Sequence, residues 1–340
     1  MTLEVALAGC GNMGRKRAAA LAPDRLAACY DVSAEAAAEL ARETGAVACG
    51  SLDELLERGT DVVLVATSHD ALADTASRAL AAGAHVLVEK PGARTVDELG
   101  AVVDQAASSG RLLKVGFNHR FHPGIARAAE EALSGRHGEI MFVRGRYGHG
   151  GRLGYESEWR MRPEISGGGE LMDQGMHMLD LSHWLLGPLP LHGALLRANF
   201  WDVAVEDNAL LILADPGERG PWSSFHVSWS EWKNEFALEV YCRRAKLQVS
   251  GLWGSYGQQV LRIYRMRPEL GPPDEEIVEY SEKDESWAAE WQFFRDAVLQ
   301  EPTSQTLQQT VAKSVESARY ALATIEQAYR LTGVAVAETT

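Results

Sequence analysis

The first third of the chain alternates short apolar runs with segments of helical periodicity. The apolar runs occupy residues 3–8, 26–30, 61–66, 85–88 and 112–115. Runs without polar alternation are typical of strands that are buried on both faces. Helical segments follow at 33–44 and 71–82, and Ser51-Leu-Asp-Glu54 and Thr95-Val-Asp-Glu98 are capping boxes that open two more helices. This pattern predicts an α/β fold with a doubly wound parallel sheet of six strands, with a ligand at the carboxyl ends of the strands.

The pattern changes in the second part of the chain. A helix is predicted at residues 124–133, followed by an alternating strand at 139–147. Further strand-like stretches lie at 195–204, 208–213, 224–230, 236–242, 246–250, 259–264 and 276–280. Their spacing favours a meandering antiparallel sheet, and helices at 285–299 and 307–331 close the chain. Because 340 residues are too many for one ordinary core, we expect two domains, residues 1–121 and residues 122–340.

A glycine-rich segment follows the first predicted strand directly and leads into a helix. In this position Gly9 makes the tight turn, Gly11 lets the backbone approach a pyrophosphate, and Gly14 lets helix and strand pack closely. The helix begins with N–H groups that have no partner within the helix, which favours a bound phosphate. We therefore predict a dinucleotide cofactor held by Gly9, Gly11, Asn12, Met13 and Gly14.

Asp31 ends the second predicted strand. A carboxylate at this place accepts hydrogen bonds from the ribose hydroxyls of an adenosine and repels a 2′-phosphate, which favours NAD over NADP. The alternative is a helix cap or a turn residue before Ser33, and the ribose role is the better interpretation because Asp31 follows the glycine loop.

Glu89-Lys90-Pro91 follows the buried run at 85–88, at the ligand-binding edge of the predicted sheet. Lys90 can direct a positive charge at a substrate hydroxyl and stabilise a developing alkoxide. Taken alone, a surface lysine in a strand-to-loop turn is the better interpretation of Lys90. Pro91 restricts the backbone of Lys90.

A run of three glycines, Gly167 to Gly169, precedes a segment with helical periodicity. Asp173 and His177 are four residues apart, so on a helix both side chains leave the same face. A carboxylate beside an imidazole orients it and stabilises its charged form, as a proton-abstracting histidine requires. Two alternatives stay open: a solvated surface pair, or a metal site formed by Asp173, His177, Asp180 and His183.

Together these motifs resemble the Gfo/Idh/MocA family of oxidoreductases. The resemblance rests on the glycine loop with Asp31, on Glu89-Lys-Pro91 and on the run from Gly167 to Asp180, with further support from residues 116–123 and from Trp159-Arg160. It implies a Rossmann domain, an α/β domain with a large open, mainly antiparallel sheet, a tightly held nicotinamide cofactor and a sugar or cyclitol substrate. It also implies the catalytic set Lys90, Asp173 and His177, a cis Lys90–Pro91 bond, and a homodimer or homotetramer formed through the sheet.

One segment departs from the family pattern. Where members commonly carry Pro-Asn-x-x-His after the third strand, this chain has Ser68-His69-Asp70-Ala71-Leu72. Leucine therefore stands at position 72 in place of the histidine. We still expect Thr67, Ser68, His69, Glu89 and Lys90 to line the cofactor.

Several other residues are candidates for contact with the substrate. Tyr147, Tyr155 and Glu158 lie near the predicted covering loop, where a sugar can meet them. In the resembled family the motifs that contain Asn118, Arg120, Trp159 and Arg160 approach the site. We expect these residues to bind the substrate together with Lys90, Asp173 and His177.

Composition narrows the class of protein. The net charge is −14, which argues against a nucleic-acid partner and permits a cationic substrate. No apolar run is long enough to span a membrane, so we expect no membrane partner. The four cysteines form no Cys-x-x-Cys pair, so neither a zinc site nor a disulfide framework is indicated and no metal is expected. Without a disulfide framework, a reducing cytoplasm is the simplest location.

The sequence thus predicts an NAD-dependent dehydrogenase that oxidises a ring secondary alcohol of a sugar, cyclitol or amino sugar to a ketone. An aminoglycoside-type intermediate of natural-product biosynthesis is one such substrate. The alternatives are an NAD(P)H-dependent keto-sugar reductase, which would use the same groups in reverse, and a nucleotide-binding sensor without catalysis.

Overall fold

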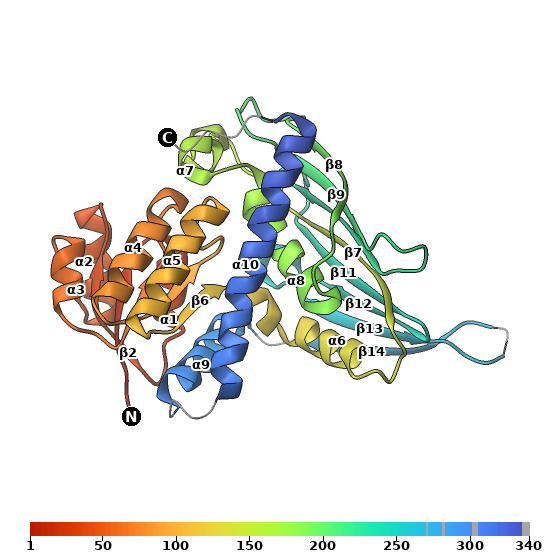
Figure 1. Ribbon diagram of the computed structural model, residues 1–340, viewed down its shortest axis with the longest axis horizontal. Helices are drawn as coiled ribbons and strands as arrows, with labels where there is room; N and C mark the ends of the chain where they lie inside the picture. Colours follow the sequence, from red (N-terminus) through yellow and green to blue (C-terminus); the bar gives the residue numbers. More distant parts are fainter. Residues whose placement is uncertain (270, 281–282, 301–304, 335–340) are drawn as a thin grey trace. The chain divides into compact units, whose positions relative to one another are not determined.

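The computed structural model describes residues 1–269, 271–280, 283–300 and 305–334 (Figure 1). Contacts within the chain define two units. The first unit combines Met1–Asn118 with Trp287–Arg319, and the second combines His119–Ser286 with Tyr320–Thr340. The predicted boundary after residue 121 lies close to the first of these changes, whereas residues 287–319 belong to the first unit and not to the second. The predicted end of the second domain at residue 340 lies outside the described residues.

The first unit is built on a parallel sheet with the strand order β3-β2-β1-β4-β5-β6. Its strands are β1 (Glu4–Ala8), β2 (Arg25–Tyr30), β3 (Val47–Ala48), β4 (Val62–Val65), β5 (His85–Glu89) and β6 (Leu113–Gly116). Its helices are α1 (Asn12–Ala19), α2 (Ala34–Thr44), α3 (Leu52–Glu57), α4 (His69–Ala81) and α5 (Val96–Ser109). The prediction of a six-stranded doubly wound sheet is confirmed. The strand β3 is too short to show a sequence period of its own.

The two predicted capping boxes form as expected. Ser51 Oγ accepts a hydrogen bond from the Glu54 N–H at 3.1 Å and opens α3. Thr95 Oγ1 accepts one from the Glu98 N–H, also at 3.1 Å, and opens α5. Each cap satisfies an N–H that has no partner within its helix, typically worth about 1 kcal/mol.

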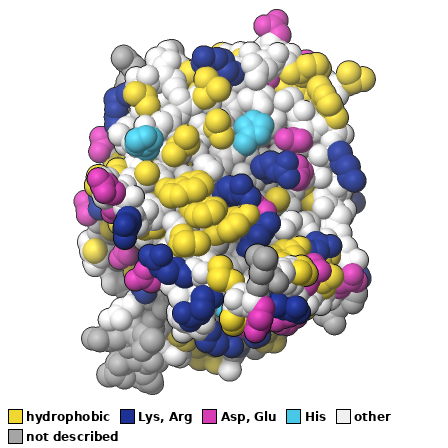
Figure 2. All heavy atoms as spheres, turned by 90° about the vertical axis from the view of Figure 1, so that its right-hand side faces the viewer, with side chains coloured by type: hydrophobic (Ala, Val, Ile, Leu, Met, Phe, Trp, Pro, Cys, Tyr) yellow, Lys and Arg dark blue, Asp and Glu magenta, His cyan; other side chains and the backbone are white. Residues whose placement is uncertain are grey.

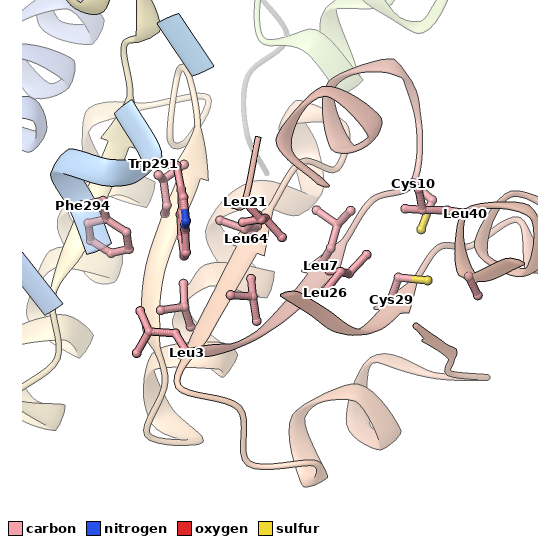
Figure 3. Packing of buried hydrophobic residues seen from close by; sticks show 14 of the residues in the cluster. Leu3, Leu7, Cys10, Leu21, Leu26, Cys29, Leu40, Leu64, Trp291 and Phe294 are labelled. Carbon is pink, nitrogen blue, oxygen red and sulfur yellow. The ribbon is translucent and has the colours of Figure 1, made fainter. Parts of the chain in front are cut away.

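A helix from the far end of the chain completes the core of the first unit. Trp291 and Phe294 of α9 (Ser286–Leu299) pack in one cluster with Leu3, Leu7 and Leu64 of the sheet (Figure 3). Both aromatic side chains are at most 2% exposed. The last helix, α10 (Gln305–Thr332), contributes residues up to Arg319 to this unit and later residues to the second unit.

The second unit is built on an eight-stranded sheet with the order β14-β13-β12-β11-β7-β10-β9-β8. Its strands are β7 (Ile140–Gly148), β8 (Leu191–Arg197), β9 (Asn208–Ala214), β10 (Trp222–Ser228), β11 (Glu235–Cys242), β12 (Ala245–Ser250), β13 (Gln259–Arg265) and β14 (Asp274–Tyr280). The prediction of a mainly antiparallel sheet is confirmed, but the sheet is not a simple meander. The strand β7 lies between β10 and β11 and pairs parallel to β10.

The first strand after the helical segment was predicted at residues 195–204, whereas β8 ends at Arg197. The carboxylate of Asp207 accepts hydrogen bonds from the backbone N–H groups of Asn199, Phe200 and Trp201 at 2.8 to 2.9 Å. These bonds satisfy the backbone outside the sheet, so the chain turns away before β9.

Two helices cover one face of the second sheet (Figure 1). α6 (Pro123–Leu133) packs on β11 to β14, and α8 (Met176–Leu186) packs on β7 and β10. α8 packs so closely on β7 that the contact requires a glycine: a β-carbon on Gly145 of β7 would lie 1.9 Å from the terminal methyl of Met178. The remaining helical segments are α7 (Pro163–Ser166), a π-helical turn at Leu171–Gly175, and 3₁₀ turns at Asn118–Phe121, Tyr155–Ser157, Trp159–Met161 and Gly254–Tyr256.

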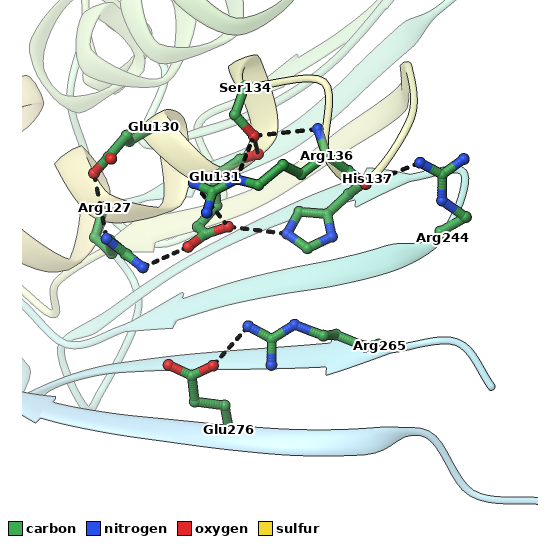
Figure 4. Close-up of polar contacts among 9 residues, drawn as sticks. All are labelled: Arg127, Glu130, Glu131, Ser134, Arg136, His137, Arg244, Arg265 and Glu276. Atoms are coloured by element: carbon green, nitrogen blue, oxygen red, sulfur yellow. Dashed lines mark hydrogen bonds and ion pairs between the residues drawn. The ribbon is translucent and has the colours of Figure 1, made fainter.

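A buried carboxylate fixes the connection from α6 to β7 (Figure 4). Glu131 lies 2.6 Å from Arg127 Nη2 and 3.0 Å from His137 Nε2. Burial opposes the ionisation of Glu131. The hydrogen bond from His137 and the positive charges of Arg127 and Arg136 outweigh this effect, so the pKa of Glu131 is lowered.

Candidate active site

The glycine loop of the first unit has the features that a dinucleotide site requires. Gly9 has φ +97°, and a β-carbon there would lie 2.4 Å from the carbonyl oxygen of Ala66. A β-carbon on Gly14 would lie 1.9 Å from the carbonyl oxygen of Gly9, so α1 begins in contact with the loop. A β-carbon on Gly11 would meet no atom within 4 Å. Packing in the chain therefore explains Gly9 and Gly14, while Gly11 leaves open space that suits a pyrophosphate.

Asp31 lies beside this loop, because β2 is the neighbour of β1 in the sheet. Its carboxylate accepts hydrogen bonds from the Cys10 N–H at 2.7 Å and from the Ser33 N–H at 2.8 Å. The two interpretations of Asp31 are thus compatible: it shapes the turn, and as a carboxylate it keeps acceptor positions for ribose hydroxyls.

The segment after β4 contributes the next group of predicted cofactor residues. Ser68 precedes α4 and its hydroxyl donates to Asp70 Oδ1 at 2.6 Å. His69, the first residue of α4, is buried, and so is Leu72, which stands at the departure from the family pattern. The cofactor roles of Asn12, Met13, Thr67, Ser68 and His69 stay predictions.

Glu89 was predicted to line the cofactor, but its carboxylate belongs to a buried network of charges. Glu89 Oε1 lies 2.5 Å from Arg17 Nε. Arg17 Nη1 lies 2.7 Å from Glu290, whose other oxygen lies 2.5 Å from Lys114 Nζ. Burial opposes ionisation of Glu290, yet Lys114 and Arg17 outweigh it and lower its pKa. The next residue, Lys90, is half-buried, and the Lys90–Pro91 peptide bond is cis, as the resemblance implied.

In the second unit, Asp173 lies in a π-helical turn that runs directly into α8, which carries His177. The sequence predicted a regular α-helix here. A π-helical turn has i to i+5 hydrogen bonds and holds more residues than an α-helical turn. Such turns occur frequently at functional sites. His177 is buried, and the Asp173 side chain is 17% exposed.

Asp173 has a cationic neighbour that the spacing of residues did not predict. Arg160 Nε lies 3.4 Å from Asp173 Oδ2, and the guanidinium lies 4.6 Å above the ring of Trp159. Glu158 forms ion pairs with Arg152 and, at 3.6 Å, with Arg160. The predicted substrate residues 158–160 and Asp173 are therefore brought together, with most of their charge compensated.

His177 also has an aromatic neighbour that sequence reasoning missed. The rings of His119 and His177 stack with centroids 3.7 Å apart and an interplanar angle of 23°. His119 lies in the motif at 116–123, but no local period relates it to His177. Tyr147 of β7 completes this group, with ring centroids 5.2 Å from His119 and 6.2 Å from His177.

Two predicted tyrosines are buried beside carboxylates. Burial, followed by the charges of Asp173 and Glu170, raises the pKa of Tyr155 above its usual range. For Tyr147, burial and the neighbouring Tyr256 raise the pKa most. Both hydroxyls thus stay protonated at neutral pH. Tyr155 Oη lies 3.5 Å from His149 Nε2, and the Tyr147 hydroxyl forms a hydrogen bond with Tyr256. Tyr155 also packs against Trp201 and Trp229, in a cluster behind the site.

Arg120, in the 3₁₀ turn at Asn118–Phe121, is held by Asp180 of α8. Its Nη2 and Nε lie 2.6 and 2.9 Å from the two oxygens of Asp180, which is fully buried. His183 stacks on Tyr320 with centroids 4.8 Å apart. Two residues of the alternative metal set therefore have protein partners, and no group of three or more metal-ligating side chains occurs in the described ranges. Asn118 is buried, and its substrate role stays a prediction, as does that of Arg120.

The glycine run that precedes the π-turn packs against the protein itself. A β-carbon on Gly169 would lie 2.1 Å from the Glu206 carbonyl oxygen, and one on Gly168 would lie 2.1 Å from the Tyr329 hydroxyl. The buried Glu206 carboxylate accepts hydrogen bonds from the Leu171 N–H at 2.9 Å and the Gly169 N–H at 3.2 Å. The run therefore allows Glu206 and α10 to hold the start of the π-turn.

We expect Glu206 to make stability depend on pH. Burial raises its pKa from 4.5 to about 7, although its hydrogen bonds act in the opposite direction. A carboxyl group with a raised pKa in the folded state binds its proton more tightly there, so stability falls as pH rises from about 4.5 to about 7. In Glu206→Gln this fall in the free energy of unfolding should shrink by about 3 kcal/mol, as measured by urea denaturation at several pH values. Equal pH dependence in both proteins would contradict the assignment.

Comparison with known proteins identifies the family. Residues 3–117 match the model described as "Oxidoreductase family, NAD-binding Rossmann fold", and residues 125–248 match the model described as "GFO/IDH/MocA C-terminal domain". The chain belongs to the Gfo/Idh/MocA oxidoreductase family. The predicted family, the fold and the NAD-binding domain are thus confirmed. No helix among the described residues has the length and apolarity needed to cross a membrane.

Relatives within this family act on sugars and cyclitols. Levoglucosan dehydrogenase of Pseudarthrobacter phenanthrenivorans is 34% identical over 128 residues, 37% of this chain and 33% of the relative. Inositol 2-dehydrogenase 2 of Saccharopolyspora erythraea is 29% identical over 231 residues, 62% of this chain and 66% of the relative. The first of these matches thus spans about a third of the relative's length. The crystal structure of GenD2 from gentamicin A biosynthesis in complex with NAD has a TM-score of 0.79 and 25% identity, and the match covers 98% of this chain and 94% of that one.

Proposed function

We propose that this protein is an NAD-dependent dehydrogenase that oxidises a secondary alcohol on the ring of a sugar or cyclitol to a ketone. The observation that carries the proposal is a buried imidazole, His177, in a family of oxidoreductases. Its ring lies 6.2 Å from that of the buried Tyr147, on which the charge of Asp173, the ion-pair partner of Arg160, also acts. His177 is the proton acceptor for the substrate hydroxyl. From the family resemblance we assign to Lys90 the stabilisation of negative charge that develops on a substrate oxygen.

The residues of the first unit fit NAD. Gly11 and the start of α1 would face the pyrophosphate, and Asp31 would accept hydrogen bonds from the adenosine ribose. When bound, NAD supplies a nicotinamide ring that accepts hydride from the carbon that carries the hydroxyl. The protein's own contribution is to hold the hydroxyl, accept its proton and exclude water.

Asp173 acts together with Arg160. Arg160 Nε lies 3.4 Å from Asp173 Oδ2, so a cation accompanies this carboxylate beside the buried Tyr147. We assign to Asp173 a contact with the substrate hydroxyls or the orientation of His177. Tyr147 and Tyr155, which keep their protons, donate hydrogen bonds to neighbouring hydroxyls of the ring.

The substrate is a neutral or an amine-bearing ring polyol. Similarity to GenD2 from gentamicin A biosynthesis favours an aminoglycoside-type ring, while similarity to levoglucosan and inositol dehydrogenases favours a neutral ring. Glu158 is compensated by Arg152 and Arg160, so an ammonium group would have to compete with both arginines for it.

A panel of sugars, cyclitols and aminoglycosides, each tested for reduction of NAD, examines this proposal. We expect turnover with at least one ring polyol. Faster turnover of amine-bearing compounds than of their neutral analogues identifies an amino sugar, and the reverse identifies a neutral substrate. Tight NAD binding without reduction by any compound would contradict catalysis and would favour a nucleotide-binding sensor. The reverse reaction is tested with the ketone that corresponds to each compound, by measuring the oxidation of NADH.

We also propose that the face of the second sheet opposite α6 and α8 forms a homo-oligomer interface. Hydrophobic side chains gather across the middle of this face (Figure 2). Trp222, Phe142 and Tyr241 are neighbours in register on β10, β7 and β11, and their rings stack with centroids 4.3 to 4.4 Å apart. Leu195, Leu210 and Ile212 extend the patch and are 40 to 46% exposed. An exposed apolar patch of this kind is typical of an interface.

Replacing Trp222 and Ile212 by glutamate should therefore convert the oligomer to a monomer, because two charges would have to be buried without partners. Light scattering after gel filtration measures the change. Leu133→Glu is the matched control, because Leu133 is also exposed but lies at the end of α6 on the other side of the sheet. A wild-type protein that is itself monomeric would contradict the interface.

The four cysteines are buried free thiols. This state agrees with the reducing cytoplasm that we propose as the location.

A further inference from the structure

We propose that His119 is a positioning residue that fixes the ring of His177 by face-to-face contact and restricts the pair to a single proton. The inference rests on the proposed role of His177 as the proton acceptor. His119 belongs to the 3₁₀ turn at Asn118–Phe121, and His177 belongs to α8. The two elements are far apart in the sequence, but both residues lie in the second unit.

The contact between the two rings is close and both rings are buried. Their centroids are 3.7 Å apart at an interplanar angle of 23°, and the residues are 4% and 6% exposed. A flat ring against a flat ring at this distance prevents rotation of the His177 ring out of its plane. His119 therefore controls the direction in which the ring nitrogens of His177 point.

His119 is itself fixed by aromatic side chains from several elements. His122 meets it edge to face at 5.3 Å, Tyr147 of β7 lies at 5.2 Å, and Phe236 of β11 meets it at 5.8 Å. These contacts surround His119 with rigid rings, so it provides a firm surface for His177. This is the arrangement expected of a residue that supports a catalytic side chain.

Stacking also couples the protonation of the two rings. Two imidazolium ions at 3.7 Å would repel each other strongly in a buried site, so the pair holds at most one proton near neutral pH. Other titratable groups around the pair are His122, Tyr147, Tyr256 and, in the π-turn segment, Glu170 and Asp173. Burial lowers the pKa of His122 to about 4, against the effect of Asp284, so His122 is neutral at pH 7.

This coupling suits a proton acceptor. His177 must be neutral before it takes the hydroxyl proton, and it is cationic afterwards. A neutral His119 then presents the face of an aromatic ring to the new cation, which is a favourable contact. The charges of Asp173 and Glu170 act on Tyr147, whose ring lies 6.2 Å from that of His177, and negative charge in this region favours the cation as well.

The experiment compares His119→Phe with His119→Ala in the full-length enzyme. Phenylalanine keeps a flat ring and removes the second titrating group, whereas alanine removes the ring. We expect kcat to fall about 10 to 10²-fold in His119→Ala through loss of positioning, with KM and NAD affinity nearly unchanged. His119→Phe should retain most of kcat. His122→Phe is the matched control, since it changes another buried histidine of the same cluster.

The second readout is an NMR titration of histidine ring signals, which needs no turnover. The wild-type pair should take up two protons in steps more than about one pH unit apart, and His119→Phe should show one step for His177. The proposal is overturned if both His119 variants keep the wild-type kcat and the His177 titration is unchanged. It is also overturned if His119→Phe, His119→Ala and His122→Phe lose activity and thermal stability alike, because His119 would then serve folding alone.

The two readouts separate this inference from the proposed function. If His177→Ala keeps normal turnover, the proposed function fails even when the two-step titration is observed. If His177→Ala is inactive and the titration of His177 is the same in His119→Phe as in the wild type, the proposed function stands and the positioning role fails.

Discussion

Replacement of His177 by alanine is expected to lower kcat by about 10² to 10⁴-fold, the usual contribution of a general base. The side chain is buried in the second unit, whereas the glycine loop and Asp31 lie in the first. NAD affinity should therefore stay close to that of the wild type. Steady-state kinetics with the best ring polyol and a titration of NAD binding measure the two effects separately.

His183→Ala is the control for this variant. His183 lies on the same helix and stacks on Tyr320, but it is part of the proposed site only if the site is a metal centre. We expect His183→Ala to keep nearly full turnover. Near-normal turnover of His177→Ala would contradict its role as the proton acceptor, and equal loss in both variants would favour the metal alternative.

Replacement of Arg17 by methionine is expected to destabilise the protein by about 3 to 5 kcal/mol, because it leaves the buried carboxylate of Glu89 without its cation. Arg17 is 2% exposed and lies between Glu89 at 2.5 Å and Glu290 at 2.7 Å. In the variant Glu290 keeps Lys114, while Glu89 loses its ion-pair partner. The free energy of unfolding from urea denaturation gives the magnitude.

Arg25→Met is the matched control for the buried network. Arg25 pairs with Glu4 at 2.6 Å, but both side chains are largely exposed, so removal should change stability little. Glu89 precedes Lys90 directly, so we also expect Arg17→Met to lower turnover. If Arg17→Met were no less stable than Arg25→Met, the network would not be the support of the Glu89-Lys90 turn.

The first unit could be predicted from the sequence almost completely. Short, mainly apolar runs marked five of its six strands, and the capping residues Ser51 and Thr95 marked two helix starts. These signals are local, since they depend on neighbouring residues along the chain. The position of α9 in this unit could not be predicted, because Trp291 and Phe294 would fit any apolar core.

The second unit was predicted less well for the same reason. Strand positions followed from alternation, but the central place of β7 depends on which strands pair, and alternation carries no such information. The candidate site shows the same limit. The sequence identified Asp173 and His177, whereas the π-turn, the contact of Arg160 with Asp173 and the stack of His119 on His177 depend on residues that the fold brings together.

The most direct test of the account uses a substrate with deuterium on the carbon that carries the reacting hydroxyl. Mass spectrometry of the cofactor after a single turnover shows where the label goes. We predict that the reduced nicotinamide carries the deuterium and that the labelled substrate reacts more slowly in the wild type. Release of the label to water, or a ketone formed without labelled NADH, would contradict the proposal that this protein is an NAD-dependent dehydrogenase of ring alcohols.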